Sequence, residues 1–123
     1  MLVRNVRWVG VATEHYAAMV DFLESTMGLQ KKFEEPTTVE FTTVDGDAIQ
    51  VMAAGDPYFE FFTQHAAGPV PLFEVDDVHQ ARLELESAGV QLIGELGQDR
   101  DWEWIHFRAP DGNLYEMASR RRS

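Results

Sequence analysis

Two stretches of the chain have similar sequences: FTTVDGDAIQV at residues 41–51 and FRAPDGNLYEM at residues 107–117. They lie 66 positions apart, and the Asp-Gly pairs that begin at Asp45 and Asp111 coincide. Asp-Gly between apolar residues is typical of a hairpin turn, because glycine readily takes the positive backbone angle φ that a tight turn needs. The sequence therefore predicts the same β-hairpin twice, which is the first sign of an internal repeat.

The repeat extends to the segment before each hairpin. Residues 20–30 read like residues 82–91, with one additional residue in the first copy, and the two segments reach Gly28 and Gly89. Apolar residues recur at steps of three and four, which predicts a helix with one buried face that ends at a left-handed glycine. The apolar positions are Tyr16, Met19, Val20, Leu23 and Met27 in the first copy, and Val78, Ala81, Leu85 and Ala88 in the second.

Each copy also begins with an apolar run and has a further strand between its helix and its hairpin. The runs cover residues 6–12 and 69–75, and the further strands residues 32–34 and 92–95. Each copy is therefore expected to form a strand, a helix and three more strands.

The length of 123 residues fits a single domain, residues 1–123, built from these two repeats. The copies cover about residues 1–54 and 68–118, joined by a linker at 55–67. The linker holds an aromatic cluster between Tyr58 and Phe62, a composition that favours a local core or a dimer contact over a ligand site.

Acidic residues outnumber Lys and Arg by 21 to 10, which gives a net charge of −11. A phosphate backbone or an anionic membrane surface would be repelled by this charge, whereas a small cation would be attracted. We therefore expect a small-molecule ligand, and neither nucleic acid nor membrane as a partner.

The chain has no cysteine, which excludes disulfides, thiolate metal sites and cysteine nucleophiles. The apolar stretch at residues 8–12 is too short for a signal-peptide core or a membrane span. These features predict a cytoplasmic protein.

The second copy carries the most specific motifs, FEVDDV at residues 73–78 and the stretch at residues 107–117. With them the chain resembles, over nearly its whole length, the vicinal oxygen chelate superfamily of glyoxalases, bleomycin-resistance proteins and extradiol dioxygenases. The resemblance implies an α+β fold in which two βαβββ modules form a curved, mixed sheet. This sheet makes a cup with the helices on its outer face.

Strand alternation indicates which side chains face the cup. Near the C-terminus the odd-numbered residues are apolar and are expected to pack under a helix, so the even-numbered residues face the concave side. The odd-numbered residues are Ile105, Phe107, Tyr115 and Met117. By the same reasoning, the candidate ligand-binding residues are Trp8, Glu40, Gln50, Trp104, His106 and Glu116.

Metal-dependent members of the superfamily hold their ion with His, Glu, His and Glu from four strands. The resemblance places Trp8, Gln50, Val70 and Glu116 at these positions. Glu116 is a good ligand and the Gln50 amide oxygen a weak one, but Trp8 and Val70 have no donor atom for a metal. We therefore expect neither a metal ion nor another cofactor.

The sequence is compatible with two functions. The favoured one is metal-independent binding of a small planar molecule, with a cation as the favoured charge type, because the cup carries tryptophans and carboxylates. The alternative is a lyase, isomerase or dioxygenase of the same superfamily that uses Glu116 and His106 as acid and base, with or without a divalent metal. His106 and Glu116 could also only satisfy each other as buried polar groups, and one tryptophan could fill the cup.

A third class of function is a structural or regulatory dimer. We expect a homodimer, since small members of the superfamily usually build their cups with a partner. The sequence leaves open whether the modules pair within one chain or between two chains.

Overall fold

The computed structural model describes residues 1–122, which form eight strands, three α-helices and one π-helical turn, η1. In chain order the elements are β1 (Val3–Ala12), α1 (Tyr16–Asp21), η1 (Phe22–Thr26), β2 (Gln30–Glu35), β3 (Thr38–Thr42), β4 (Ala48–Met52), α2 (Phe59–His65), β5 (Val70–Val75), α3 (Val78–Ser87), β6 (Leu92–Gln98), β7 (Trp102–Arg108) and β8 (Leu114–Arg120).

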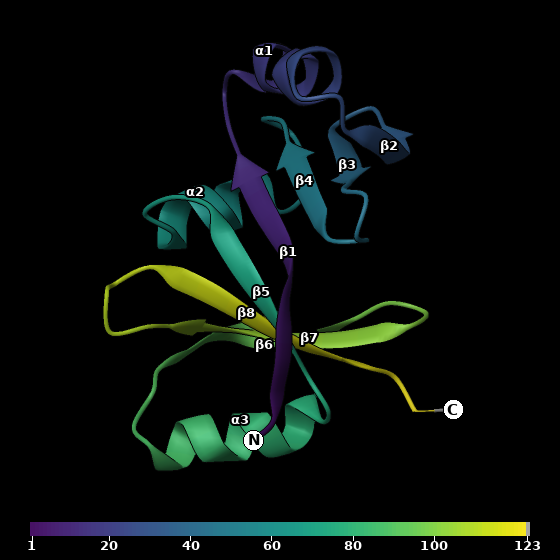
Figure 1. The fold of residues 1–123 in the computed structure, drawn as a ribbon. Coiled ribbons are helices and arrows are strands. Elements are labelled where there is room, and N and C mark those ends of the chain that lie inside the picture. Colours follow the sequence, from purple (N-terminus) through teal and green to yellow (C-terminus); the bar gives the residue numbers. More distant parts are fainter. Residues whose placement is uncertain (123) are drawn as a thin grey trace.

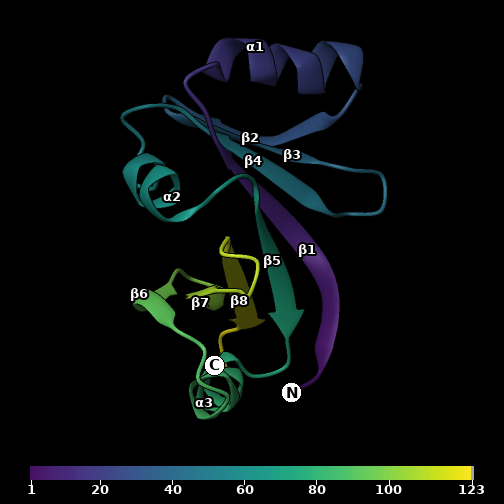
Figure 2. The same ribbon diagram turned by 90° about the vertical axis from the view of Figure 1, so that its left-hand side faces the viewer.

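All eight strands join one sheet in the order β2-β3-β4-β1-β5-β8-β7-β6 (Figure 1). The first strand of each copy runs parallel to the last, β1 with β4 and β5 with β8, while the other pairs are antiparallel. β1 and β5 pair with each other, so the two modules meet within one chain. Figure 2 shows the sheet curving between α1 and α3, which lie at its two ends. The predicted α+β class with a curved mixed sheet is confirmed.

The additional residue of the first copy is taken up by a π turn. The helix that begins as α1 continues as η1, and the Met27 N–H donates to the Phe22 carbonyl five residues earlier, at 3.0 Å. A π turn holds one more residue than the α turn it replaces. The Met27 side chain is 56% exposed, so its predicted place on the buried face is wrong.

Both helices nevertheless end in the same way. The Leu29 N–H donates to the Leu23 carbonyl in the first copy, and the Val90 N–H donates to the Leu85 carbonyl in the second, both at 3.0 Å. The glycine before each donor has a φ of 74° or 79°, which confirms the left-handed ends predicted at Gly28 and Gly89. Ala88 lies in the closing turn of α3 and is exposed, so its predicted burial is also wrong.

Each module has a core between its helix and the outer face of its strands. Ile105, Phe107 and Met117 are buried against α3, and Tyr115 packs on the same cluster, as the odd-numbered positions predict. The first module has a smaller cluster around Leu23 and Phe41. The even-numbered residues are thereby left to the concave side.

A third cluster lies on the concave side and includes a helix that the sequence analysis did not predict. The linker at residues 55–67 contains α2, and Phe62 of α2 is 3% exposed among Met52, Val70 and Leu114. The aromatic cluster of the linker thus contributes a local core, which was one of its two expected roles.

The repeated Asp-Gly hairpins have the same backbone hydrogen bonds. The Thr43 N–H donates to the Asp47 carbonyl at 2.9 Å, and the Ala109 N–H donates to the Asn113 carbonyl at 3.0 Å. The second hairpin also forms hydrogen bonds with α2 and with the residues that follow it. Arg108 donates to the His65 carbonyl at 3.1 Å. The Asn113 side chain accepts from the Ala67 N–H at 2.7 Å and donates to the Pro69 carbonyl at 3.1 Å.

No helix within residues 1–122 is long and apolar enough to cross a membrane.

Candidate functional site

A cavity of about 410 Å³ lies on the concave side of the sheet, between the two modules. This volume is within the range of small-molecule sites, roughly 300–1,000 Å³. The structure brings all six predicted site residues to its wall: Trp8, Glu40, Gln50, Trp104, His106 and Glu116. Ligand binding by these residues remains a prediction.

On the first module's wall, the polar groups of three side chains form a hydrogen-bonded chain. The Trp8 indole Nε1–H donates to Gln50 Oε1 at 3.2 Å, and Gln50 Nε2 donates to Thr38 Oγ1 at 2.9 Å. The Thr38 hydroxyl in turn donates to the Val51 carbonyl at 2.8 Å. This chain fixes the Trp8 ring and leaves the Gln50 carbonyl oxygen bound to the indole.

Each of two tryptophans lies against a glycine of the sheet. A Cβ added at Gly10 would come within 2.2 Å of the Trp8 ring, and one added at Gly97 would come within 2.2 Å of Trp104 Nε1. Any larger residue would therefore push the indole away from the strand. Trp8 also packs edge-on against Phe62 with 6.2 Å between ring centroids. The rings therefore line the wall and leave the cavity open.

On the second module's wall, His106 and Glu116 are directly opposite each other on β7 and β8. Both are buried, with 4% and 6% of their surface exposed. His106 Nε2 lies 3.6 Å from Glu116 Oε2, and this nitrogen has no hydrogen-bond partner. Two phenylalanines of α2, Phe61 and Phe62, pack on the imidazole with centroid distances of 4.9 and 5.8 Å.

Tyr58 also lines the cavity, although the sequence analysis did not choose it as a site residue. Burial raises the pKa of its phenol above the ordinary value, and the Glu116 carboxylate raises that pKa further, while a hydrogen bond with Trp104 opposes the shift. The sequence signal for this residue was the aromatic run that begins at Tyr58 and continues into α2. The direction of the Tyr58 side chain could not be predicted without knowing that α2 lies on the concave side.

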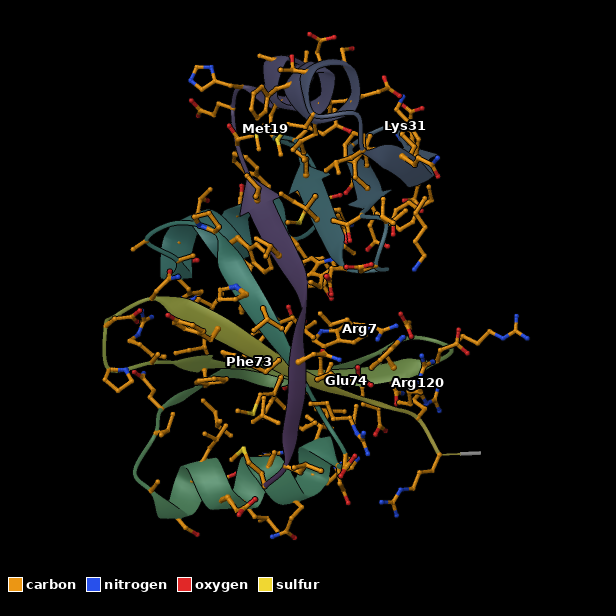
Figure 3. All side chains as sticks on the ribbon, viewed as in Figure 1. Arg7, Met19, Lys31, Phe73, Glu74 and Arg120 are labelled. Atoms are coloured by element: carbon orange, nitrogen blue, oxygen red, sulfur yellow. The ribbon has the colours of Figure 1, made fainter. Side chains whose placement is uncertain are left out.

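Cations at the cavity wall are already paired. Arg7 lies 3.0 Å from Glu74, and Lys32 lies 3.4 Å from the buried Glu40. Two guanidinium groups lie over the Trp102 ring, those of Arg7 at 5.0 Å and Arg120 at 4.6 Å from its centroid. Figure 3 labels Arg7, Glu74 and Arg120, which lie near the paired strands β1 and β5.

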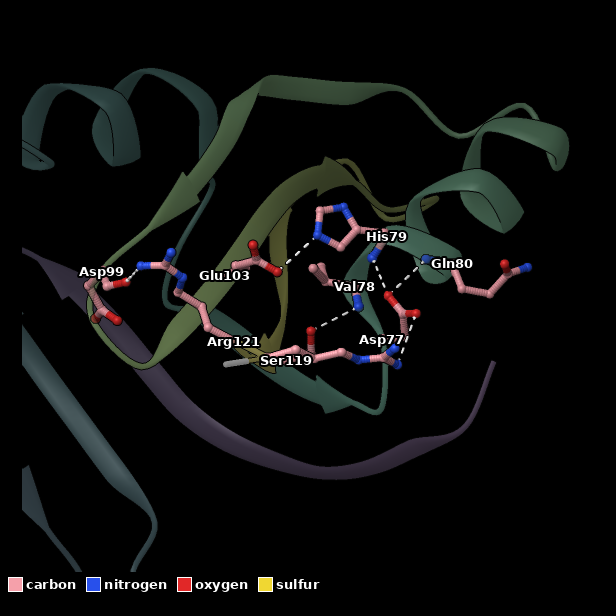
Figure 4. A network of polar contacts seen from close by, with 9 residues as sticks. Asp77, Val78, His79, Gln80, Asp99, Glu103, Ser119 and Arg121 are labelled. Atoms are coloured by element: carbon pink, nitrogen blue, oxygen red, sulfur yellow. Dashed lines mark hydrogen bonds and ion pairs between the residues drawn. The ribbon is translucent and has the colours of Figure 1, made fainter.

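The loop between β6 and β7 adds two carboxylates, Asp99 and Asp101, to the wall. The Asp99 side chain accepts the backbone N–H groups of Asp101 and Trp102 at 2.9 and 2.8 Å. Arg121 donates to the Asp99 backbone carbonyl at 2.8 Å (Figure 4). Within residues 1–122 neither carboxylate has an ion-pair partner, so the cavity keeps a negative field.

The residues at the superfamily's metal positions do not fit a metal ion. Val70 is fully buried in the concave cluster, and Trp8 offers only an N–H that donates to Gln50. Glu116 is then the single carboxylate of the set. Across the described part of the chain, no group of three or more His, Cys, Asp or Glu side chains is arranged to hold a metal.

The fold and the cavity together define a cup-shaped protein of two βαβββ modules with room for a small molecule. The profile of the Glyoxalase/Bleomycin resistance protein/Dioxygenase superfamily matches residues 5–117, and the chain belongs to this superfamily. The predicted family is therefore confirmed. No curated protein sequence matches the chain.

Solved structures share the fold at low sequence identity. A superfamily member from Vibrio splendidus 12B01 is 19% identical with a TM-score of 0.70, over 98% of this chain and 100% of that one. A methylmalonyl-CoA epimerase is 21% identical with a TM-score of 0.69, over 99% of each chain. A Mn(II)-bound glyoxalase from Novosphingobium aromaticivorans is 20% identical with a TM-score of 0.66, over 96% of this chain and 40% of that one.

Proposed function

We propose that this protein binds a small, planar, cationic molecule in its cavity without a metal ion. The observation that carries the proposal is the Glu116 carboxylate, which is buried at the cavity wall beside aromatic rings. Within residues 1–122 no Lys or Arg pairs with it, and His106 at 3.6 Å is its one ion-pair candidate. A buried carboxylate favours a cationic partner, because removing charge from water is costly unless the charge is paired.

The aromatic rings suit the flat part of such a ligand. Trp8, Trp104 and Tyr58 all line the cavity. Their rings attract a cation through their electron-rich faces, and they stack on flat apolar groups. The unpaired Asp99 and Asp101 and the net charge of −11 raise the local concentration of cations near the mouth.

The proposal is tested by titrating the protein with a panel of aromatic cations and neutral molecules of the same shape, with tryptophan fluorescence as the signal. Planar cations are expected to quench the fluorescence equally with and without EDTA. Trp104→Ala is expected to weaken binding by about 0.5–2 kcal/mol, as for a lost stacking or cation–π contact. The exposed Leu83 on α3 provides a matched control, since Leu83→Ala changes a residue outside the cavity.

Two results would contradict the proposal. One is the absence of quenching by any planar cation in a protein that is folded. The other is a rise of several degrees in melting temperature on addition of Zn²⁺, Mn²⁺, Fe²⁺ or Ni²⁺ that Glu116→Ala abolishes, because a tight ligand of the native state must raise the melting temperature.

A second function is favoured by the unpartnered His106 Nε2 beside the Glu116 carboxylate. A lyase or isomerase could use these groups as acid and base, and several of the similar structures, among them an epimerase and a glyoxalase, carry the names of enzymes. A dioxygenase of this superfamily is less well supported, since the residues at the metal positions do not fit an ion. Turnover of a bound ligand that His106→Gln abolishes would favour the enzyme.

The homodimer and the cytoplasmic location remain predictions. The Tyr58–Phe62 cluster gave the sequence-based reason for a dimer contact, but Phe62 is buried and Tyr58 lines the cavity. β1 and β5 pair within one chain, so the two modules contact each other without exchange between copies, and the dimer itself is tested by sedimentation.

A further inference from the structure

The hydrogen bonding of the cavity wall is incomplete at one place. Among the described residues, two buried side-chain atoms lack a partner, Glu84 Oε2 and His106 Nε2, and of these residues only His106 lines the cavity. A buried nitrogen without a partner destabilises the folded protein, because it has lost its bond to water and gained nothing in return. A group that enters the cavity and bonds to this nitrogen would remove that cost.

The neighbouring carboxylate does not satisfy the imidazole. The 3.6 Å between His106 Nε2 and Glu116 Oε2 exceeds the 2.7–3.2 Å of an N–H···O hydrogen bond. The Phe61 and Phe62 rings pack on the imidazole and restrict its movement. The two polar atoms are therefore held side by side at the wall, close enough for one small group to reach both.

Tyr58 and Trp104 complete the surroundings of this pair on the cavity side. The Glu116 carboxylate is near enough to Tyr58 to raise the pKa of its phenol. The indole N–H of Trp8 is engaged by Gln50. Among the described residues of the cavity wall, His106 Nε2 is the buried polar atom that lacks a partner, so we expect a ligand's own polar group to bind at Glu116 and His106.

We infer that the ligand carries a cationic group with N–H bonds, as in a protonated aminoheterocycle or an amidine. One N–H of this group donates to the Glu116 carboxylate and another donates to His106 Nε2, which accepts as the unprotonated nitrogen of the imidazole. The inference rests on the proposed function and narrows its ligand class. A quaternary nitrogen has the same charge but no hydrogen to donate. It would leave both buried groups without a hydrogen bond, so it is expected to bind more weakly.

The experiment compares two probes with the same ring system and the same charge, 4-aminoquinolinium and 4-(dimethylamino)-1-methylquinolinium, in which methyl groups replace every N–H. Both are titrated against the wild-type protein, Glu116→Gln and His106→Phe, with tryptophan fluorescence as the signal. His106→Phe keeps an aromatic ring against Phe61 and Phe62 and removes the nitrogen. The melting temperature of each variant shows that it is folded.

Glu103→Gln provides the matched control. Glu103 is on the same strand as His106, but it pairs with His79 at 2.9 Å and does not line the cavity. The substitution removes the same unit of negative charge as Glu116→Gln from the outer face of β7. A general charge effect would therefore appear in both variants, whereas a direct hydrogen bond would be lost only in Glu116→Gln.

In the wild-type protein and in Glu103→Gln, the N–H probe is expected to bind about tenfold or more tightly than the methylated probe, the ratio typical of a hydrogen bond to a charged group. In Glu116→Gln and His106→Phe this ratio is expected to shrink towards one. Equal binding of both probes to the wild-type protein would overturn the inference and leave the proposed function intact. Binding of neither probe, nor of any other planar cation, would overturn both.

Discussion

The two modules share one chain pattern but anchor their helices differently. In the second module α3 buries three side chains, Val78, Ala81 and Leu85. In the first module α1 buries none and η1 buries only Leu23. The repeat therefore keeps the elements that set the fold, the glycine ends and the Asp-Gly turns, while the amount of buried surface under each helix has diverged.

The cavity walls differ in a second way. On the first module's wall, the polar groups of Trp8, Gln50 and Thr38 bond to one another or to the main chain. On the second module's wall, His106 Nε2 has no partner. The module with the better-anchored helix thus carries the incompletely bonded polar groups. Such groups are expected where a ligand binds, and a firmly packed module can hold them in place.

The largest effect is expected from removing the equivalent leucines of the two helices. Leu23→Ala and Leu85→Ala are each expected to lower the free energy of unfolding by about 2–5 kcal/mol, because both side chains are buried and the space would not collapse completely. Chemical denaturation measures this loss. Leu83→Ala, at a 58% exposed position of α3, is the control and should change stability by less than about 0.5 kcal/mol.

Amide hydrogen exchange separates the two leucines. After Leu23→Ala the first helix has no buried side chain left, so its amides are expected to exchange faster than the rest of the module. After Leu85→Ala, α3 still has Val78 and Ala81. Similar exchange of α1 and α3 in their respective variants would show that the unequal burial does not control local stability.

The second-largest loss of stability is expected from substituting the glycines that lie against the two tryptophans. Gly10→Ala places a methyl group against Trp8 and Phe62, both packed in the concave cluster, and is expected to cost about 1–3 kcal/mol of stability. Gly97→Ala places a methyl group against Trp104 alone, which can swing towards the cavity. We expect a smaller loss of stability there, with a change in tryptophan fluorescence, and equal losses would contradict this difference.

Much of the fold follows from the sequence, because it rests on local rules. Glycine supplies the left-handed ends of both helices at Gly28 and Gly89, and alternation along β7 and β8 placed Trp104, His106 and Glu116 on the concave side. These residues could be assigned to the concave side without knowing any distance between them, since side chains two positions apart on a strand point to the same face of the sheet.

The sequence-based predictions are wrong or incomplete where tertiary contacts, and not local sequence patterns, determine the conformation. Met27 fits a helical stripe, but the π turn before it changes the direction of its side chain. The short helix α2 is stabilised by contacts of Phe62 with residues far away in the chain, among them Met52 and Leu114. Tyr58 reaches the cavity only because α2 packs there, so no local pattern could assign it.

The smallest effect is expected from the side-chain cap that only the second helix has. Asp77 accepts the His79 and Gln80 N–H groups at 2.9 and 3.3 Å (Figure 4), whereas His15 at the start of α1 makes no such bond. Asp77→Ala is expected to lower the melting temperature by a few degrees at neutral pH, because the first turn of α3 loses its acceptor. Asp77→Asn keeps an acceptor oxygen and should lose less.

The pH dependence of these variants tests the cap directly. The backbone N–H groups of Gln80 and His79 hold the pKa of Asp77 below its usual value, with a smaller contribution from Arg122. A carboxyl group with a depressed folded pKa stabilises the protein above its unfolded pKa of about 3.9, and this stabilisation is lost as the pH falls through the lower folded pKa. The difference in melting temperature between the wild-type protein and Asp77→Ala should therefore be constant at neutral pH and shrink only below about pH 4. Asp77→Asn, which cannot titrate, should show no such loss relative to Asp77→Ala. A difference that stays constant down to the lowest pH at which the protein is folded would show that the charge of Asp77 contributes nothing to the cap.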